Sequence, residues 1–188
     1  KLYALSLQNG KPQWSEPFKA DGGIVTTPFV GSGKVFVGSF DGNVYALDAA
    51  TGRVAWKFDD SGWFWSSPVS DGKRVYAATT KGILHALDIG TGKEVWQFNL
   101  QQPVLSTPVI LQDGNVVVAS DGGSVHVLSP TGAQVSSYNL GEKALVQAPL
   151  TTDGQIVYVN AMDKRVWAIR ITSGRQEKVW QISTDTKK

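Results

Sequence analysis

Hydrophobic and polar positions alternate in short runs along this chain, and glycine-containing turns separate the runs. Residues 34–39 and 43–48, for example, are rich in β-branched and aromatic side chains and alternate as β-strands do. Asp41-Gly42 lies between them, and this pair predicts a tight hairpin because glycine accepts the positive φ of such a turn. No segment of ten or more residues shows helical periodicity, so the chain is predicted to be all-β.

The pattern recurs about every forty residues. Glycines stand at steps of 42, 40, 40 and 42 residues, namely Gly10, Gly52, Gly92, Gly132 and Gly174. Prolines follow at steps of 40, 40 and 41 residues, namely Pro28, Pro68, Pro108 and Pro149. A period near forty with four strand-like runs per repeat predicts a β-propeller of four-stranded antiparallel blades.

Four complete blades and one half blade are expected in a single domain over residues 1–188. We name the strands of a blade A to D in chain order. The complete blades are 23–58 (strands 24–30, 34–39, 43–48, 53–58), 63–99 (65–69, 74–79, 83–88, 94–98), 104–140 (105–111, 115–119, 124–128, 134–138) and 145–182 (146–151, 155–160, 165–171, 178–182). The half blade, 1–18, has only strands C and D, at 2–7 and 12–14.

A half blade leaves unpaired backbone groups at an open edge. We therefore expect the chain to be part of a larger ring, or its open blade to be closed by another chain. A four-blade ring with the extra hairpin docked outside is the alternative. The chain begins directly in a strand and shows no signal peptide, so a mature protein or an excised piece is expected.

The turns between strands C and D share a sharper motif. Residues 46–56 and 86–96 read A-x-D-x-x-T-G-x-x-x-W, and residues 4–14 keep the Ala, Gly and Trp. Asp and Thr can bond the free N–H groups of the turn, Gly takes its left-handed conformation, and Ala leaves room for an indole. The motif residues are Ala4, Gly10, Trp14, Ala46, Asp48, Thr51, Gly52, Trp56, Ala86, Asp88, Thr91, Gly92, Trp96 and Trp180.

This motif resembles the tryptophan-docking motif of the PQQ-like (pyrroloquinoline quinone) repeat family, and the resemblance covers the whole chain. It implies a propeller in which the tryptophan clamps adjacent blades, a role that would fall on Trp14, Trp56 and Trp96. The fourth repeat departs from the pattern, with Ser136 where Trp is expected. The fifth has two extra residues, so Trp180 comes late.

Composition narrows the functional classes. Hydrophobic residues make up 41% and charged residues 18%, and the net charge of +2 is scattered, with no basic run beyond Lys187-Lys188. Nucleic acid is therefore not an expected partner. The absence of cysteine excludes disulfides, thiol catalysis and cysteine-based zinc sites. No apolar stretch approaches the ~18 residues of a membrane span, so direct membrane insertion is not expected.

No catalytic residue, metal site or cofactor is predicted. The resemblance implies a dehydrogenase with quinone and calcium as one possibility, but the adjacent cysteines that many of those enzymes carry are missing. His85 and His126 occupy the strand-C position of Tyr3, Tyr45 and Trp167, which indicates packing. The aspartates lie mostly in Asp-Gly turns: Asp41, Asp71, Asp113, Asp121 and Asp153.

Trp63-Phe64-Trp65 is the unusual local feature. It lies where strand D of one blade crosses to strand A of the next, near the central opening of the ring, and Gln101 and Gln102 lie on the same rim. Exposed aromatic side chains mark recognition surfaces. These residues are therefore a candidate binding rim, and packing between blades is the alternative interpretation.

These observations favour a non-catalytic scaffold that binds protein partners. The resemblance implies an extracytoplasmic location (periplasmic, cell-surface or secreted) and a role such as protein assembly in the bacterial envelope. Two alternatives remain open: a sensor or ligand-binding ectodomain fragment of a larger receptor, and a fragment of a PQQ-dependent dehydrogenase.

Overall fold

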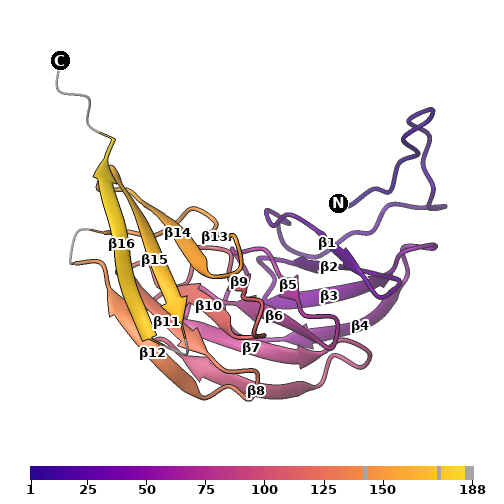
Figure 1. Cartoon of the computed structure of the whole chain (residues 1–188). Helices are drawn as coiled ribbons and strands as arrows, with labels where there is room; N and C mark the ends of the chain where they lie inside the picture. Colours follow the sequence, from indigo (N-terminus) through magenta and orange to yellow (C-terminus); the bar gives the residue numbers. More distant parts are fainter. Residues whose placement is uncertain (142–143, 173–174, 185–188) are drawn as a thin grey trace.

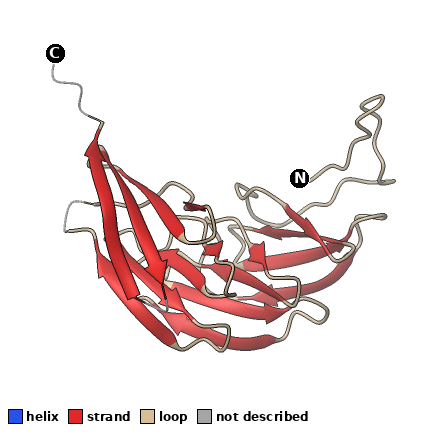
Figure 2. Ribbon diagram, viewed as in Figure 1, coloured by secondary structure: helices blue, strands red, loops and turns tan. Residues whose placement is uncertain are grey.

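The computed structural model describes residues 1–141, 144–172 and 175–184, and Gly174 and the terminal lysines lie outside these ranges. The described residues form four four-stranded antiparallel sheets and no helix (Figure 2). In every sheet the strands follow chain order, as in β1-β2-β3-β4, so each sheet is a meander. The predicted all-β propeller fold of four-stranded blades is confirmed.

The four sheets have these bounds. The first holds β1 (Phe29–Gly31), β2 (Lys34–Gly38), β3 (Asn43–Asp48) and β4 (Val54–Asp59), and the second β5 (Val69–Ser70), β6 (Arg74–Ala78), β7 (Ile83–Asp88) and β8 (Glu94–Asn99). The third holds β9 (Val109–Ile110), β10 (Val116–Ala119), β11 (Ser124–Leu128) and β12 (Gln134–Asn139), and the fourth β13 (Thr151–Thr152), β14 (Ile156–Ala161), β15 (Arg165–Thr172) and β16 (Arg175–Ser183).

The sheets follow one another around an open arc (Figure 1). The A strands β1, β5, β9 and β13 lie toward the concave side, and the D strands β4, β8, β12 and β16 lie along the outside. The N-terminal hairpin lies at one end of the arc and β16 at the other. Apolar clusters fill the spaces between successive sheets, so each blade is stabilised mainly by its neighbours.

The A strands are shorter than predicted. Only two or three residues of each pair with strand B, and the residues before them lead across from the preceding blade. Before the paired residues, a buried hydroxyl takes the place of backbone hydrogen bonds between strands A and B. The Thr26 hydroxyl donates to the Gly38 carbonyl (3.2 Å) and accepts from the Gly38 N–H (3.1 Å). In the run 24–30, Ile24 and Phe29 pack against the cores between blades, whereas Val25 is exposed, so its apolar character does not reflect pairing within a sheet.

The N-terminal hairpin also departs from regular strands. Residues 1–18 pair at two isolated bridges, Leu2 with Phe18 and Leu5 with Pro12, where two strands were predicted. Without A and B strands beside it, the hairpin has no sheet that would hold it flat. Its turn nevertheless repeats the geometry of complete blades, since the Gly10 N–H donates to the Ser6 carbonyl at 2.8 Å, as Gly52 does to Asp48.

Three tryptophans join successive blades. The indole of Trp14 lies on Gly52, that of Trp56 on Gly92, and that of Trp96 on Gly132, so closely that a Cβ at each glycine would approach the ring to 2.5, 2.5 and 2.6 Å. Each indole N–H donates to a carbonyl of the next blade, at Ala49 (2.9 Å), Ile89 (3.1 Å) and Pro130 (2.9 Å). Glycine is required at these turns for both space and positive φ.

A second contact recurs at every joint. An aromatic ring near the end of one blade lies against the strand-C side chain of the next: Phe18 on Tyr45 (4.9 Å between centroids), Phe58 on His85 (4.9 Å), Phe98 on His126 (5.6 Å) and Tyr138 on Trp167 (6.3 Å). Both histidines therefore belong to the packing between blades.

The fourth and fifth repeats, which depart from the motif, contact each other through a different joint. In the complete blades that have a tryptophan, an alanine pairs with the tryptophan and an aromatic residue pairs with the alanine, as in Phe36–Ala46–Trp56. The third sheet has Val117–Val127–Ser136 at these positions. No indole is available at that joint. Instead the Gln176 amide, in the longer hairpin of β15 and β16, donates to the Ser136 hydroxyl at 3.1 Å. The serine and the two extra residues thus form one alternative joint.

The C–D turns are capped by their own side chains. In the first sheet the Asp48 carboxylate accepts from the Thr51 N–H (2.8 Å) and hydroxyl (2.7 Å), and Asp88 and Thr91 repeat this in the second sheet. These hydrogen bonds, from the Thr hydroxyl first and the backbone N–H second, lower the pKa of both carboxyls below its ordinary value.

The capped carboxyls should make stability depend on acid pH. Their folded-state pKa lies below the unfolded value of about 3.9, so their contribution is complete above that pH and is lost as pH falls through the folded-state pKa. We expect the free energy of unfolding in urea to decline from about pH 5 to about pH 2. The double variant Asp48→Asn, Asp88→Asn should lose less over this interval, and an equal loss would contradict the assignment.

Candidate functional site

The crossovers between blades and the B–C turns together form one rim of the arc, which we call the crossover rim. Backbone hydrogen bonds hold each crossover against a turn: Phe40 N–H to Gly23 carbonyl (2.9 Å), Thr80 to Trp63 (2.9 Å), Asp121 to Pro103 (2.7 Å) and Met162 to Leu145 (2.9 Å). Side chains on this rim therefore project from a fixed backbone.

Trp63, Phe64 and Trp65 alternate in burial. Phe64 is fully buried in the core between the first two sheets, whereas Trp63 is 56% exposed and Trp65 47% exposed. Phe64 packs over Gly38, where a Cβ would lie 2.6 Å from the Phe64 Cβ. The buried ring therefore anchors the crossover and directs the two indoles outward.

Phe40 completes an aromatic cluster with the two indoles. Its ring centroid lies 5.5 Å from that of Trp63, at 31° between planes, and 5.3 Å from that of Trp65, at 22°. Sequence reasoning missed Phe40, although its place at the start of a B–C turn on the same rim was a usable signal. We call Phe40, Trp63 and Trp65 the aromatic cluster.

Other apolar side chains are exposed at equivalent positions. Val25 corresponds in the repeat to Trp65 and Leu145 to Trp63, and Met162 starts the last B–C turn as Phe40 starts the first. The crossover rim is thus apolar at several points along the arc, and the aromatic cluster is its largest apolar element.

Gln101 and Gln102 lie on the next crossover but make different contacts. Gln101 is exposed, and its N–H donates to the Asn99 side chain at 2.7 Å. The Gln102 side-chain carbonyl accepts from the Ser120 hydroxyl at 2.8 Å and lies against Gly122. Gln102 therefore fastens its crossover to a turn.

Asp41 fastens the first crossover. One carboxylate oxygen accepts from the Asp21 N–H (3.0 Å), the Gly22 N–H (3.1 Å) and the Tyr45 hydroxyl (2.9 Å). Burial alone would raise the pKa of Asp41, but these hydrogen bonds and those from Asn43 outweigh it and hold the pKa below its ordinary value. Burial, and then the bond to Asp41, raise the pKa of the Tyr45 hydroxyl.

His85 links two blades beneath this rim. It is buried, with Nδ1 2.6 Å from the Glu94 carboxylate and Nε2 3.4 Å from the Asp60 carboxylate of the preceding crossover. Among the described residues, no group of three or more His, Cys, Asp or Glu side chains is placed to hold a metal ion. The part of the chain that the structure describes also has no helix that could cross a membrane.

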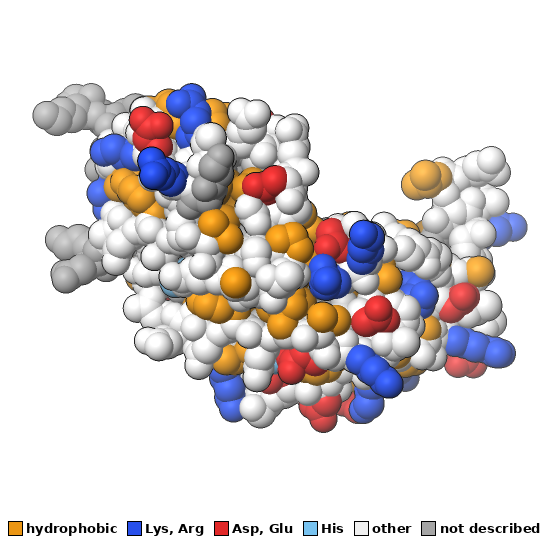
Figure 3. Space-filling model, turned by 60° about the horizontal axis from the view of Figure 1, so that its bottom comes forward, with side chains coloured by type: hydrophobic (Ala, Val, Ile, Leu, Met, Phe, Trp, Pro, Cys, Tyr) orange, Lys and Arg blue, Asp and Glu red, His pale blue; other side chains and the backbone are white. Residues whose placement is uncertain are grey.

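The charged side chains on the outer face do not favour a partner of one charge sign. Figure 3 shows Lys and Arg side chains interspersed with Asp and Glu over the face that it presents. This arrangement agrees with the small net charge of +2. The aromatic cluster is therefore the more specific feature of the surface.

The repeated blades and their indole joints define a β-propeller built of PQQ-like repeats. A family model described as "Outer membrane protein assembly factor BamB" matches residues 1–98 and 80–188, which together span the chain. The chain belongs to this PQQ-like repeat family. A comparison with curated protein sequences gives no match.

Solved structures share the fold. BamB from Moraxella catarrhalis superposes with a TM-score of 0.77 at 24% identity, covering 89% of this chain and 52% of that one. Quinohemoprotein alcohol dehydrogenase ADHIIG from Pseudomonas putida HK5 gives 0.77 at 18%, covering 92% and 36%. The computationally designed Ika4 protein gives 0.73 at 20%, covering 82% and 94%. This chain therefore spans about half of the BamB chain and about a third of the dehydrogenase.

Proposed function

We propose that this chain is a non-catalytic scaffold that binds protein partners through the crossover rim. The observation that carries this proposal is the aromatic cluster, in which two half-exposed indoles pack against Phe40. The description of the family supports a role in outer-membrane protein assembly, and with it an extracytoplasmic location in the bacterial envelope.

The cluster has the physical properties of a binding hot spot. Tryptophan contributes disproportionately to protein interfaces because it buries a large apolar area while ordering few rotatable bonds. Here the backbone is already fixed, since Trp63 and Thr80 exchange hydrogen bonds and Phe64 is buried below. A partner would therefore meet a preorganised surface, which lowers the entropic cost of binding.

We also infer that this part of the chain does not catalyse quinone-dependent oxidation. The A strands and their approaches line a shallow hollow of about 250 Å³ with Thr27, Pro28, Phe29, Ser67, Pro68, Val69, Thr107 and Pro149. These residues do not fit a calcium–quinone group, because calcium requires several converging carboxylate or amide oxygens and none of them supplies a carboxylate. A thermal shift with quinone and calcium would contradict this inference.

The double variant Trp63→Ala, Trp65→Ala should lose partner binding while the fold stays intact. As a probe we suggest an unfolded outer-membrane β-barrel polypeptide, labelled and diluted from urea, with binding followed by fluorescence anisotropy. Hot-spot truncation costs more than about 1 kcal/mol per residue, so affinity should fall at least about tenfold. Both indoles are half exposed, so the melting temperature should change little.

Trp180→Ala is the matched control, because Trp180 is 40% exposed and lies outside the crossover rim, on β16. It should bind the probe like the unaltered chain at submicromolar protein concentration. Replacing both rim tryptophans by phenylalanine should retain most of the affinity. Equal binding by the alanine double variant would overturn the proposal.

A further inference from the structure

Carboxylate groups lie beside the aromatic cluster, on the side of Phe40. Asp41 follows Phe40 directly in the first B–C turn, and its carboxylate accepts a hydrogen bond from the Asp21 N–H at 3.0 Å. Asp59, the last residue of β4, pairs in register with Asn43 at the other end of this turn. The fold thus brings three aspartates, from a crossover, a turn and a strand end, to one corner of the crossover rim.

The Tyr45 hydroxyl lies among these three aspartates. It donates a hydrogen bond to the Asp41 carboxylate at 2.9 Å. Burial and this bond raise the pKa of the hydroxyl most, and the negative charges of Asp21 and Asp59 raise it further. Because the Coulomb interaction falls with distance, both charges lie close to this hydroxyl and therefore to Asp41.

Asp21 and Asp59 are exposed and unpaired. Among the residues that the structure describes, neither carboxylate forms an ion pair or accepts a hydrogen bond. The Asp41 carboxylate, by contrast, holds the crossover and its own turn through several hydrogen bonds. The charges of Asp21 and Asp59 are therefore available to a partner.

Two lysines lie near the same part of the rim but do not cancel this negative charge. Lys57 pairs in register with Tyr45, and Lys81 lies in the B–C turn of the second sheet. Asp60 lies beside Lys81, since both side chains would contact a Cβ at Gly62. Four aspartates therefore stand against two lysines, and the rim around the aromatic cluster is net negative.

We propose that the aromatic cluster binds an extended polypeptide segment that carries a Lys or Arg close to an aromatic or long aliphatic side chain. This inference rests on the proposed function, because the cluster supplies the apolar half of the contact. The apolar side chain of the segment packs on the exposed indoles of Trp63 and Trp65, and the cation lies toward Asp21 and Asp59.

The size of the site sets the spacing of the two side chains. The indole of Trp65 lies 5.3 Å from the Phe40 ring, and the next residue along the chain, Asp41, leads to the carboxylates. The two contacts are therefore about 10 Å apart, a distance that an extended chain covers in about three residues.

The charge of the rim disfavours other classes of partner. Phosphate groups of nucleic acids and anionic lipid headgroups would be repelled by the unpaired carboxylates. A basic side chain would instead be attracted, and its aliphatic stem could lie along the aromatic rings while its charged end reaches the carboxylates. A basic and apolar polypeptide segment therefore complements both halves of the surface.

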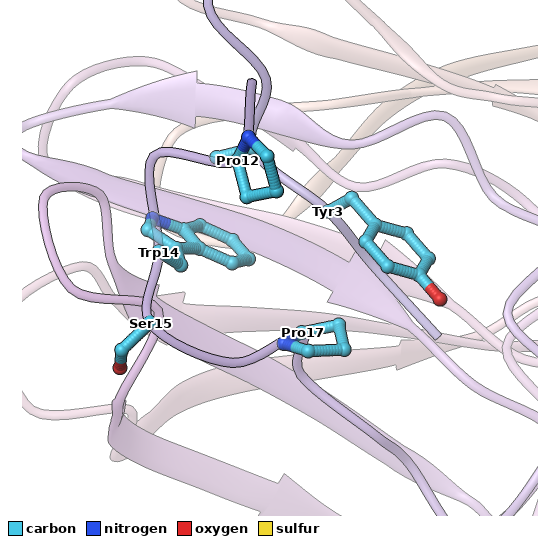
Figure 4. Close-up of a pocket in the computed structure, with 6 residues that line it drawn as sticks. Tyr3, Pro12, Trp14, Ser15 and Pro17 are labelled. Carbon is cyan, nitrogen blue, oxygen red and sulfur yellow. The ribbon is translucent and has the colours of Figure 1, made fainter. Parts of the chain in front are cut away.

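The apolar cavity at the N-terminal hairpin does not offer such a site. Its volume is about 90 Å³, whereas ligand pockets commonly measure about 300–1,000 Å³. Figure 4 shows the rings of Tyr3, Pro12 and Pro17 around Trp14, and Ala4 and Ser15 complete a lining that contains no charged side chain.

Three blocked ten-residue peptides that differ at one position test the inference. Each has two tyrosines in a glycine–serine background, and three residues after the second tyrosine it has lysine, glutamine or glutamate. Binding to the full chain is followed by NMR through the indole N–H signals. An exposed ion pair changes affinity about two- to fivefold, so the lysine peptide should bind tighter than the glutamine peptide by this factor, and the glutamate peptide should bind most weakly. These differences should shrink in 0.5 M salt.

The double variant Asp21→Asn, Asp59→Asn should bind the lysine and glutamine peptides about equally. Neither carboxylate accepts a hydrogen bond within the described part of the chain, so circular dichroism should match that of the unaltered chain. Glu177→Gln is the control, because its side chain is 76% exposed on β16, away from the rim. This variant should keep the preference for lysine.

The peptides separate this inference from the proposed function. Equal affinities of the unaltered chain for the three peptides, or no binding of the lysine peptide at millimolar concentration, would refute the basic segment. A preference for lysine that survives in the folded double aspartate variant would refute it as well. The proposed function is decided separately, by whether Trp63→Ala, Trp65→Ala loses the unfolded β-barrel polypeptide.

Discussion

Replacing Trp56 by alanine is expected to lower the free energy of unfolding by about 3–5 kcal/mol. The indole is buried, lies on Gly92, donates its N–H to the Ile89 carbonyl at 3.1 Å, and contacts Phe36 at 5.7 Å between ring centroids. Its removal leaves a cavity between two sheets and an unpaired carbonyl at the joint. Since domains of this kind are stable by roughly 5–15 kcal/mol, the loss should be obvious in urea denaturation.

Trp180→Ala tests whether the joint causes that loss. Trp180 has the same register within its blade and the same kind of aromatic neighbour, Tyr158, but among the described residues no further blade covers it. At low protein concentration its truncation should cost less than half as much as that of Trp56. Equal losses would show that the tryptophans act within their own sheets and not between them.

Gly92→Ala is expected to destabilise the chain by about 2–5 kcal/mol. Gly92 has φ +72°, a conformation that costs an L-residue about 1–2 kcal/mol. A Cβ there would also approach the Trp56 ring to 2.5 Å, and the resulting overpacking typically adds about 1–3 kcal/mol. Urea denaturation measures the sum of the two effects.

Gly72→Ala separates strain from collision. Gly72 has φ +87°, but a Cβ there would meet nothing within 4 Å, so only the cost of the backbone conformation, about 1–2 kcal/mol, should remain. Combining Gly92→Ala with Trp56→Ala should also be less damaging than the sum of the two single changes, because the colliding ring is gone. Strict additivity would argue against contact between the two residues.

Local sequence predicted the strands and turns well because they depend on local rules. Hairpin strands B and C follow from alternating side chains and from glycine at turns of positive φ, such as Gly42 and Gly82. The A strands were predicted too long, because in a run such as 24–30 only Phe29 and Val30 pair with strand B, while the residues before them cross from the preceding blade. Apolar composition does not distinguish a crossover from a paired strand.

The candidate site could be predicted only in part from the sequence. Trp63-Phe64-Trp65 drew attention by composition, yet which ring is buried depends on how the crossover meets Gly38 and the core. Phe40 stands 23 residues before Trp63 in the chain, so no local pattern connects them. The two rings meet because the Phe40 N–H is bonded to one crossover and the Phe40 ring faces the next.

By itself the sequence determined the repeat, the four-stranded blade and the positions of the turns, since these follow from short-range backbone preferences and from a period that every blade shares. Only the tertiary structure decided which side chains meet across blades. Trp56 lies on Gly92, the Gln176 amide donates to Ser136, and Trp180 is covered by no further blade among the described residues. These pairings depend on how sheets are stacked in space, and burial between them is a property of two neighbours together.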